Sequence, residues 1–416
     1  MREVVVTGMG AVTPVGNDIE TFWKNLTAGV CGIEKLERFD TETFKAHVAG
    51  TVKDYDPLLY MEKGEARKAD LFEKFAIGAA CQAMADSGLT DENIDKTRLG
   101  VYVGSGIGGM ETFVNNAVGL HDGGPRKVSP FFVPMMISNM AAGLIAIKFK
   151  AQGPCLPIVT ACATGTHSVG EAYRTIQAGY ADAIIAGGAE AAVTPLSFAG
   201  FGNAMALSGS EDPMAASLPF DARRKGFVMG EGAGMLILEE KQHALARGAH
   251  IYAEVTGYGN TCDAHHITAP APDGKMGAAA IRMAMEQAGI LKSGIDYKNV
   301  YINAHGTGTS LNDKCETQAI KTVLGEDAYK VRISSTKSMT GHMLGAAGAV
   351  EAIVIALSLE RGIVPPTIGY AEPDPECDLD YTPNKAVQAP LEYAVSTSLG
   401  FGGHNACVAM TKFREG

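Results

Sequence analysis

The chain has 416 residues, of which 46% are hydrophobic and 19% charged, and its formal net charge is −11 at pH 7. This length exceeds one typical core and predicts two domains or a duplicated fold. The acidic balance argues against general nucleic-acid binding, so we expect no nucleic-acid partner. The start, 1–10, runs directly into a strand pattern without the apolar core of a signal peptide, and the apolar run 352–359 is too short to span a bilayer. Eight cysteines without metal-ligand spacing are typical of reduced thiols, so we expect a cytoplasmic protein that does not enter a membrane.

Strand-like runs alternate with helical patterns along the whole chain. The predicted strands lie in 3–8, 99–106, 156–161, 182–189, 251–259, 299–306, 332–337 and 394–403. Helical periodicity predicts helices over 169–178, 276–288 and 346–360. This alternation predicts an α/β fold in which helices cover sheets.

A coarse internal repeat divides the chain. Segment 4–14 is similar to 253–262, and 157–179 is similar to 332–362, with a strand leading into a turn of small residues in each case. These pairs predict two similar halves, 1–250 and 251–416. A site at the junction of such halves would collect residues from both.

Cys162 follows the apolar run 156–159, which predicts a buried strand, and precedes the helix pattern that Gly179 ends. A cysteine at a helix N-terminus faces free N–H groups and the positive end of the helix dipole, which favour the thiolate and lower the thiol pKa. We therefore interpret Cys162 as a candidate nucleophile. The alternative is a cysteine chosen only for packing.

The run 101–109 contains Gly104, Gly106 and Gly109 in the G-x-G-x-x-G spacing of dinucleotide sites. The segment that follows is polar and irregular, and no acidic residue ends a strand at the expected distance. We interpret these glycines as close packing beside a pocket, with Ile107 as an apolar wall residue.

Three segments of the second half contain polar groups that suit catalysis. They place His305 before Thr307 and Thr309, Lys337 before His342 and Glu351, and Phe401 between glycines. Each has a simpler explanation: a structural histidine, a solvated Lys–His pair or a flexible turn. Together, two neutral histidines can donate to one developing oxyanion, and the backbone N–H groups of Cys162 and Phe401 can form a second oxyanion hole.

Four segments, 160–172, 303–309, 335–348 and 398–405, resemble the signature segments of the β-ketoacyl-(acyl-carrier-protein) synthases, most closely those that elongate chains in bacterial fatty-acid synthesis. The resemblance implies the thiolase fold, in which duplicated α/β halves form a five-layered α-β-α-β-α core, usually in a homodimer. It places the nucleophile, acyl pocket and dimer interface in 1–250, and the histidines, lysine and gate loop in 251–416.

The resemblance also implies roles for single residues. Cys162 would carry the acyl chain, His305 and His342 would activate malonyl-carrier protein, Lys337 and Glu351 would support them, and Phe401 would act as the gate. Contacts to the phosphopantetheine arm would come from Thr307, Thr309 and Thr268, and the acyl pocket would be lined by Phe201 and Ile107. The arm arrives on acyl-carrier protein, so no separate cofactor is expected.

Two further expectations concern the surface and the core. Carrier proteins are acidic, and the candidate docking residues are Lys63, Arg67, Lys68, Arg126 and Lys127, which would otherwise form an ordinary solvated face. Some relatives bind a structural monovalent cation, here expected near Asn303, Glu351 and Ser396. The alternatives are a ketosynthase of polyketide or specialised lipid assembly and, from other classes, a Cys–His thioester hydrolase or a binding protein.

Overall fold

The computed structural model describes residues 1–414 of the chain. Its largest sheet has nine strands in the order β4-β5-β6-β1-β7-β13-β12-β8-β9. The strands from the first half of the chain are β1 (Val4–Val12), β4 (Leu99–Gly104), β5 (Ala183–Glu190) and β6 (Gly232–Glu240). Those from the second half are β7 (Ala253–Cys262), β8 (Val300–Asn303), β9 (Arg332–Ser334), β12 (Tyr393–Gly400) and β13 (His404–Lys412).

The two halves of this sheet have the same pairing pattern. β1 lies antiparallel to β6 as β7 does to β13, and β4 lies parallel to β5 as β8 does to β12. The halves join where Val4, Val5 and Val6 of β1 pair with β7. The repeat read in the sequence therefore corresponds to a repeated topology.

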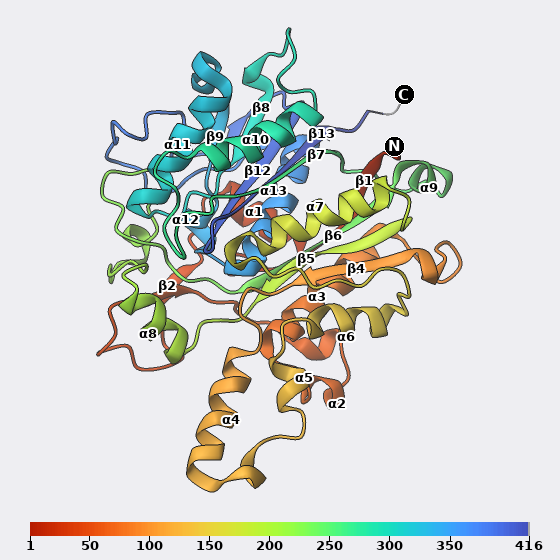
Figure 1. The fold of residues 1–416 in the computed structure, drawn as a ribbon, viewed down its shortest axis with the longest axis vertical. Helices are drawn as coiled ribbons and strands as arrows, with labels where there is room; N and C mark the ends of the chain where they lie inside the picture. The colour runs from red at the N-terminus through yellow and green to blue at the C-terminus, as the bar shows by residue number, and fades with distance from the viewer. Residues whose placement is uncertain (415–416) are drawn as a thin grey trace.

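Helices fill three layers around the two half-sheets (Figure 1). The outer helices α3 (Leu71–Ser87) and α6 (Met140–Phe149) cover the first half, and α10 (Lys275–Gln287) and α11 (Ser310–Leu324) cover the second. Between the half-sheets lie α7 (Thr164–Gln177) and α13 (Ala347–Arg361), which contact each other and strands of both halves. α13 is buried continuously from Ala347 to Leu359, because its sequence there is apolar except at Glu351 and Ser358. The predicted five-layered α-β-α-β-α core is confirmed.

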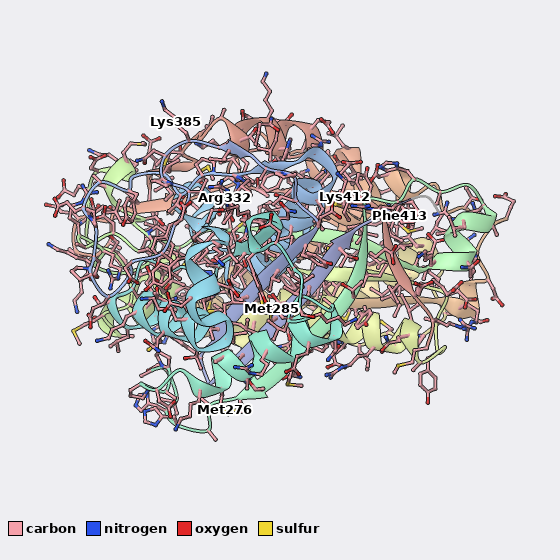
Figure 2. All side chains as sticks on the ribbon, turned by 90° about the horizontal axis from the view of Figure 1, so that it is seen from above. Met276, Met285, Arg332, Lys385, Lys412 and Phe413 are labelled. Atoms are coloured by element: carbon pink, nitrogen blue, oxygen red, sulfur yellow. The ribbon has the colours of Figure 1, made fainter. Side chains whose placement is uncertain are left out.

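Smaller elements lie around this core. They are α1 (Ile19–Thr27), α2 (Lys63–Ala66), α4 (Met110–Gly123), α5 (Phe132–Met136), α8 (Pro195–Asn203), α9 (Lys241–Ala246) and α12 (Lys337–Thr340), with the strand pairs β2 (Ile33–Lys35)–β3 (Val48–Gly50) and β10 (Ile363–Val364)–β11 (Val387–Gln388). α4 projects from the body at the bottom of Figure 1. Figure 2 turns the molecule by 90°, with Met276 and Met285 marking α10 and Lys412 marking the end of β13. Within 1–414, none of the helices is both long enough and apolar enough to cross a membrane.

The prediction of a buried strand over 156–159 is wrong. Cys155 alone bridges to Val101 of β4, while the side chains of Leu156 and Val159 are 52% and 48% exposed. The segment lies at the outer edge of the first half-sheet, where one side has no neighbouring strand in the single chain. The following helix also begins at Thr164, five residues before the predicted start at 169.

Candidate active site

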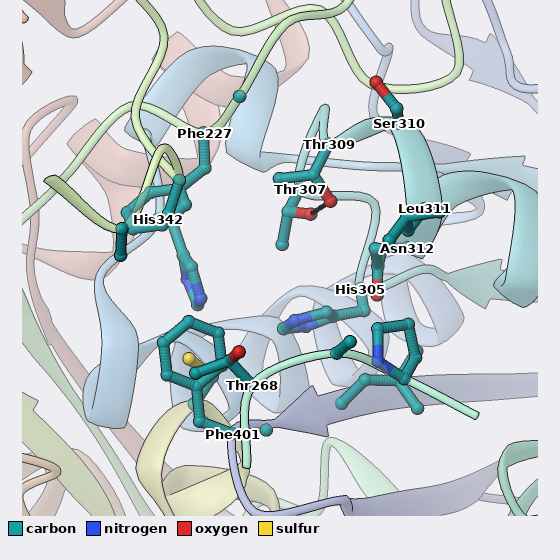
Figure 3. A pocket seen from close by; sticks show the side chains of 18 of the residues that line it. Phe227, Thr268, His305, Thr307, Thr309, Ser310, Leu311, Asn312, His342 and Phe401 are labelled. Atoms are coloured by element: carbon teal, nitrogen blue, oxygen red, sulfur yellow. Dashed lines mark hydrogen bonds between the residues drawn. The ribbon is translucent and has the colours of Figure 1, made fainter. Parts of the chain in front are cut away.

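A cavity of about 330 Å³ lies where the two halves meet (Figure 3). Of the predicted site residues, it is lined by Cys162, Phe201, Thr268, His305, Thr307, Thr309, His342 and Phe401. The fold thus brings residues 239 positions apart in the sequence, from Cys162 to Phe401, to one space. Ile107 does not line this cavity, but it packs in the same apolar cluster as Cys162 and Phe201.

Cys162 lies in a short 3-10 turn, Ala161–Ala163, directly before α7. Ala161 has a φ of 50°, a left-handed conformation that costs energy for a residue with a Cβ. The equivalent turn before α13 repeats this feature at Leu344, with a φ of 46°. The strained backbone turns the chain sharply, so that Cys162 lines the cavity at the start of the helix.

The predicted lowering of the Cys162 pKa is wrong. Burial raises the pKa of this thiol to about 12, and the positive charge of Lys337 and the backbone N–H groups of Phe401 and Cys162 lower it only in part. The free energy lost when the thiolate is removed from water exceeds the stabilisation that the helix N-terminus gives to the thiolate. The resting cysteine therefore holds its proton, while the same two N–H groups act at the sulfur.

His305 follows β8 and His342 precedes α13, and their rings lie 5.2 Å apart between centroids at 87° (Figure 3). The backbone of His342 is held between Val228, whose carbonyl accepts its N–H at 2.7 Å, and Gly230, which donates to its carbonyl at 2.8 Å. Burial, with the nearby charge of Lys337, lowers the pKa of both histidines well below the usual value. Both are therefore neutral at pH 7. Within 1–414, Nδ1 of His305 and both ring nitrogens of His342 are buried without a hydrogen-bond partner, so they are free for a ligand.

Lys337 and Glu351 lie outside the cavity and form a buried ion pair. Lys337 is 1% exposed and Glu351 2% exposed, so their mutual attraction is little screened by water. Lys337 acts on His305, His342 and Cys162 through its charge rather than by lining the cavity.

Glu316 on α11 is a residue that the sequence analysis missed. Its Oε1 accepts the N–H of His305 at 2.7 Å, and its Oε2 accepts the N–H of Gly306 at 2.8 Å. Thr397 donates its hydroxyl to the same carboxylate at 2.5 Å. Burial raises the pKa of Glu316 to about 7. The available signal was an acid on the buried face of a helix eleven residues after His305.

The loop around Phe401 needs glycine at its first position. A Cβ on Gly400 would lie 2.8 Å from the carbonyl oxygen of Thr160 and 3.4 Å from the backbone nitrogen of Cys162. Only a glycine lets the loop approach the cysteine turn this closely. The glycines at 400, 402 and 403 thus bring the Phe401 backbone to the sulfur.

Aromatic rings form one wall of the cavity. The ring of Phe401 lies 6.2 Å from that of Phe201, which lies 5.5 Å from Phe227, and Phe227 lies 5.3 Å from His342. Toward the mouth, Thr307 and Thr309 are joined by a hydrogen bond of 3.1 Å, and Thr268 is exposed. The cavity therefore has an apolar inner wall and a hydroxyl-bearing side.

The predicted docking residues are all exposed. Lys63, Arg67 and Lys68 lie on or beside α2, and Arg126 and Lys127 lie in the 3-10 turn after α4. The Lys68 amine lies 5.0 Å above the ring of Phe131, which links the first segment to the region of α5.

Each of the three residues predicted near a cation has a buried side-chain oxygen without a partner among the described residues. Asn303 and Ser396 are register partners on β8 and β12, and α13, which holds Glu351, packs against both strands. Asn303 Oδ1, Glu351 Oε2 and Ser396 Oγ have no hydrogen-bond partner among the described residues. Oxygen ligands suit a hard cation, so these residues fit the expected group. No cluster of three His, Cys, Asp or Glu side chains suited to a metal occurs within 1–414.

A duplicated thiolase-type core with one cysteine and two neutral histidines in its central cavity defines a condensing enzyme. The chain belongs to the beta-ketoacyl synthase family: the model of the N-terminal domain matches residues 1–244 and that of the C-terminal domain matches 252–371. The chain is 52% identical over 412 residues to a 3-oxoacyl-(acyl-carrier-protein) synthase 2 of Staphylococcus aureus, covering 99% of both chains, and 49% identical over 414 residues, with 99% of each covered, to the protein of that name from Synechocystis.

Solved structures agree with the fold. A ketosynthase of a type II PKS, in complex with its acyl-carrier protein and bound to the hexaketide, superposes with a TM-score of 0.91 at 38% identity over 99% of this chain and 100% of that one. A beta-ketoacyl synthase from Burkholderia phymatum gives a TM-score of 0.92 at 34% identity, with all of both chains covered.

Proposed function

We propose that this protein is an elongating 3-oxoacyl-(acyl-carrier-protein) synthase of fatty-acid biosynthesis. It joins an acyl chain held on Cys162 to the two-carbon unit of malonyl-carrier protein and releases CO2. The observation that carries the proposal is the presence of Cys162 and the two neutral histidines, His305 and His342, in one cavity between the halves. The relatives named 3-oxoacyl-(acyl-carrier-protein) synthase 2 match over nearly the whole chain.

In the first half-reaction, Cys162 sulfur attacks the acyl thioester, and the carrier thiol leaves with the proton that the cysteine held. The tetrahedral oxygen develops negative charge beside the N–H groups of Cys162 and Phe401, which lie next to the Cys162 sulfur. The acyl chain then lies along the apolar wall of Phe201 and Ile107.

In the second half-reaction, malonyl-carrier protein brings its thioester carbonyl to His305 and His342. Each neutral imidazole donates one N–H to that oxygen, so loss of CO2 gives a stabilised enolate. The enolate carbon attacks the acyl carbon, the bond to Cys162 sulfur breaks, and the 3-oxoacyl chain leaves on the carrier with two more carbons. The released Cys162 thiolate takes a proton from solvent and returns to the resting thiol. Burial keeps both histidines neutral, and the charge of Lys337, which is held by Glu351, adds to this effect.

The binding of carrier protein is proposed at Lys63, Arg67, Lys68, Arg126 and Lys127, with Thr268, Thr307 and Thr309 along the phosphopantetheine arm. The arm belongs to the carrier, so the enzyme itself needs no organic cofactor. Replacing Lys63, Arg67 and Lys68 by alanine should raise KM for acyl-carrier protein about tenfold and leave KM for acyl-pantetheine unchanged. An equal rise for both substrates would contradict docking at this patch.

A functional homodimer is part of the proposal. Apolar side chains are exposed on the projecting α4–α5 region and the sheet edge: Phe113, Val118, Leu120, Phe131, Val133, Leu156 and Val159. Such a set marks an interface more often than free surface. The proposed units are a first half, 1–250, with the cysteine, acyl pocket and interface, and a second half, 251–416, with the histidines, lysine and gate.

The unpartnered oxygens of Asn303, Glu351 and Ser396 support a structural monovalent cation between β8, β12 and α13. All eight cysteines are unpaired, which supports a location in the cytoplasm, where thiols stay reduced. A rise in melting temperature with K⁺ or Na⁺ relative to a bulky organic cation would test the cation site.

The deciding experiment mixes the protein with acyl-carrier protein and malonyl-carrier protein. The proposal predicts CO2 and a chain extended by two carbons. Release of free fatty acid without extension would identify a thioester hydrolase instead, and absence of any acyl adduct on Cys162 by intact mass would identify a binding protein.

A ketosynthase of polyketide assembly is the second candidate, because a polyketide ketosynthase superposes closely at 38% identity. The higher identity of the 3-oxoacyl-(acyl-carrier-protein) synthase 2 relatives favours fatty-acid elongation. Reaction with saturated acyl-carrier proteins but not with poly-β-keto chains would separate the two.

A further inference from the structure

Glu190 ends β5 outside the cavity and is fully buried. Its Oε1 accepts the hydroxyl of Ser105 at 2.7 Å and the N–H of Ile107 at 3.2 Å. Its Oε2 accepts the N–H groups of Gly106 at 2.9 Å and Gly345 at 3.0 Å. Burial raises the pKa of Glu190, but all four partners are donors that favour the carboxylate, so the group accepts on both oxygens.

These donors come from the two sides of the proposed reaction. Ile107 belongs to the apolar cluster that contains Cys162, on the side where the proposed acyl chain would lie. Gly345 lies in the turn Leu344–Ala346 that opens α13, three residues after His342, which would bind the malonyl thioester. One carboxylate therefore joins a wall of the acyl pocket to the turn that follows a catalytic histidine.

The backbone packs closely around this carboxylate. A Cβ on Gly345 would lie 2.5 Å from the backbone nitrogen of Gly106 and 2.9 Å from Glu190 Oε2. A Cβ on Gly106 would lie 2.8 Å from the same oxygen. The segment 105–107 and the α13 turn are therefore closely packed against each other, and both donate to the same carboxylate.

We propose that Glu190 is a positioning residue that fixes the Ile107 wall relative to the His342 turn and thereby helps to set which acyl chain lengths the enzyme accepts. The proposal rests on the proposed function, since it concerns the acyl chain held on Cys162. Glutamine cannot replace Glu190, because its amide NH2 would face two N–H or O–H donors in place of one carboxylate oxygen. The wall segment or the α13 turn would then shift.

The charge of Glu190 gives an independent readout. This carboxylate raises the pKa of the Cys162 thiol, whereas Lys337 lowers it. Removing the negative charge should therefore lower the pH at which Cys162 reacts with iodoacetamide. A buried acid far from Cys162 would not change this pH profile, so the shift reports that Glu190 is near the sulfur, and the chain-length ratio tests its positioning role.

The experiment compares the wild type, Glu190→Gln and Glu73→Gln over a series of acyl-carrier proteins from short to long chains. Glu73 is the matched control, because it is also fully buried in the first half but caps α3 away from the cavity. We expect the kcat/KM ratio between preferred and disfavoured chain lengths to narrow about tenfold in Glu190→Gln only. We also expect the pH profile of the Cys162 reaction with iodoacetamide to move to lower pH in Glu190→Gln. The same profile should not shift in Glu73→Gln.

An unchanged chain-length ratio in folded Glu190→Gln, or equal changes in both variants, would overturn the inference. If Glu190→Gln does not fold, Ser105→Ala tests the inference instead, because it removes one donor to Glu190 Oε1. This variant should narrow the kcat/KM ratio between chain lengths in the same direction but by less. Condensation by the wild type with an unchanged ratio in the variants would contradict only this inference. A wild type that extends no acyl chain would contradict the proposed function itself.

Discussion

At Cys162, burial outweighs the effect of the helix N-terminus. The thiol pKa is raised to about 12, although Lys337 and two backbone N–H groups favour the thiolate. A protonated resting cysteine suits acyl transfer, because the departing carrier thiol needs the proton. Its position in the cavity, rather than a preformed thiolate, therefore marks Cys162 as the nucleophile.

Replacing His305 or His342 by alanine should lower the rate of malonyl decarboxylation by about 10²–10³-fold, because each replacement removes one donor to the enolate oxygen. Acyl transfer to Cys162, followed by intact mass, should change much less. Cys162→Ala should abolish the acyl adduct, and Cys81→Ala, at a half-buried cysteine on α3, is the control. Decarboxylation at the wild-type rate in His305→Ala would refute the role assigned to this residue.

His167 on α7 should make the fold sensitive to acid. Burial lowers its pKa to about 4, and its Nδ1 lies 2.7 Å from the hydroxyl of Thr160. Because the unfolded chain binds a proton at about pH 6.5 and the folded protein does not, the stability from this group is present above pH 6.5. By linkage it is lost as pH falls to 4, where the loss reaches about 3 kcal/mol.

Free energies of unfolding measured across this pH range would test the effect. His167→Gln should show a shallower decline toward low pH than the wild type, and His121→Gln, at an exposed histidine, should not. Parallel curves for all three proteins would contradict the assignment.

At the scale of elements, the loop after β12 depends on the absence of side chains. Gly400→Ala would place a methyl group 2.8 Å from the carbonyl oxygen of Thr160, so the loop must move away from the cysteine turn. The Phe401 N–H then leaves the oxyanion position, and kcat/KM for condensation should fall about 10²-fold, the effect of losing one such donor.

The matched control is Gly64→Ala in α2, where a Cβ would meet nothing within 4 Å. Circular dichroism should show that both variants fold. Unchanged kcat/KM in Gly400→Ala would show that the loop tolerates the methyl group and that its glycine serves another purpose.

At the scale of the whole molecule, the first half-sheet ends in an unpaired edge at 155–160. Exposed Leu156 and Val159 on such an edge favour pairing with another chain. Leu156→Asp combined with Val159→Asp should therefore convert a dimer to a monomer in light scattering coupled to size exclusion. Leu59→Asp, at an exposed leucine elsewhere, is the control. A monomeric wild type would contradict the proposed dimer.

Local pattern accounted for much of this protein. The outer and central helices α10 and α13 lie within a residue or two of their predicted ranges, and the repeat in the sequence corresponds to the repeated topology, because periodicity and turn residues are encoded locally. The strands β6 and β13 were not recognised, since "GAGMLILEE" runs without a break into α9 and "HNACVAMTK" follows a glycine turn. Both are central strands whose identity comes from neighbours on each side.

For the candidate active site as well, some features could be predicted from the sequence and others only from the tertiary structure. The residue types at Cys162, His305, His342, Lys337 and Phe401 were readable as four motifs. Their meeting in one cavity, the raised pKa of the thiol, and the buried partners Glu316 and Glu190 depend on segments distant in the chain. Desolvation and long-range hydrogen bonds arise only when both halves pack together, so no local pattern contains them.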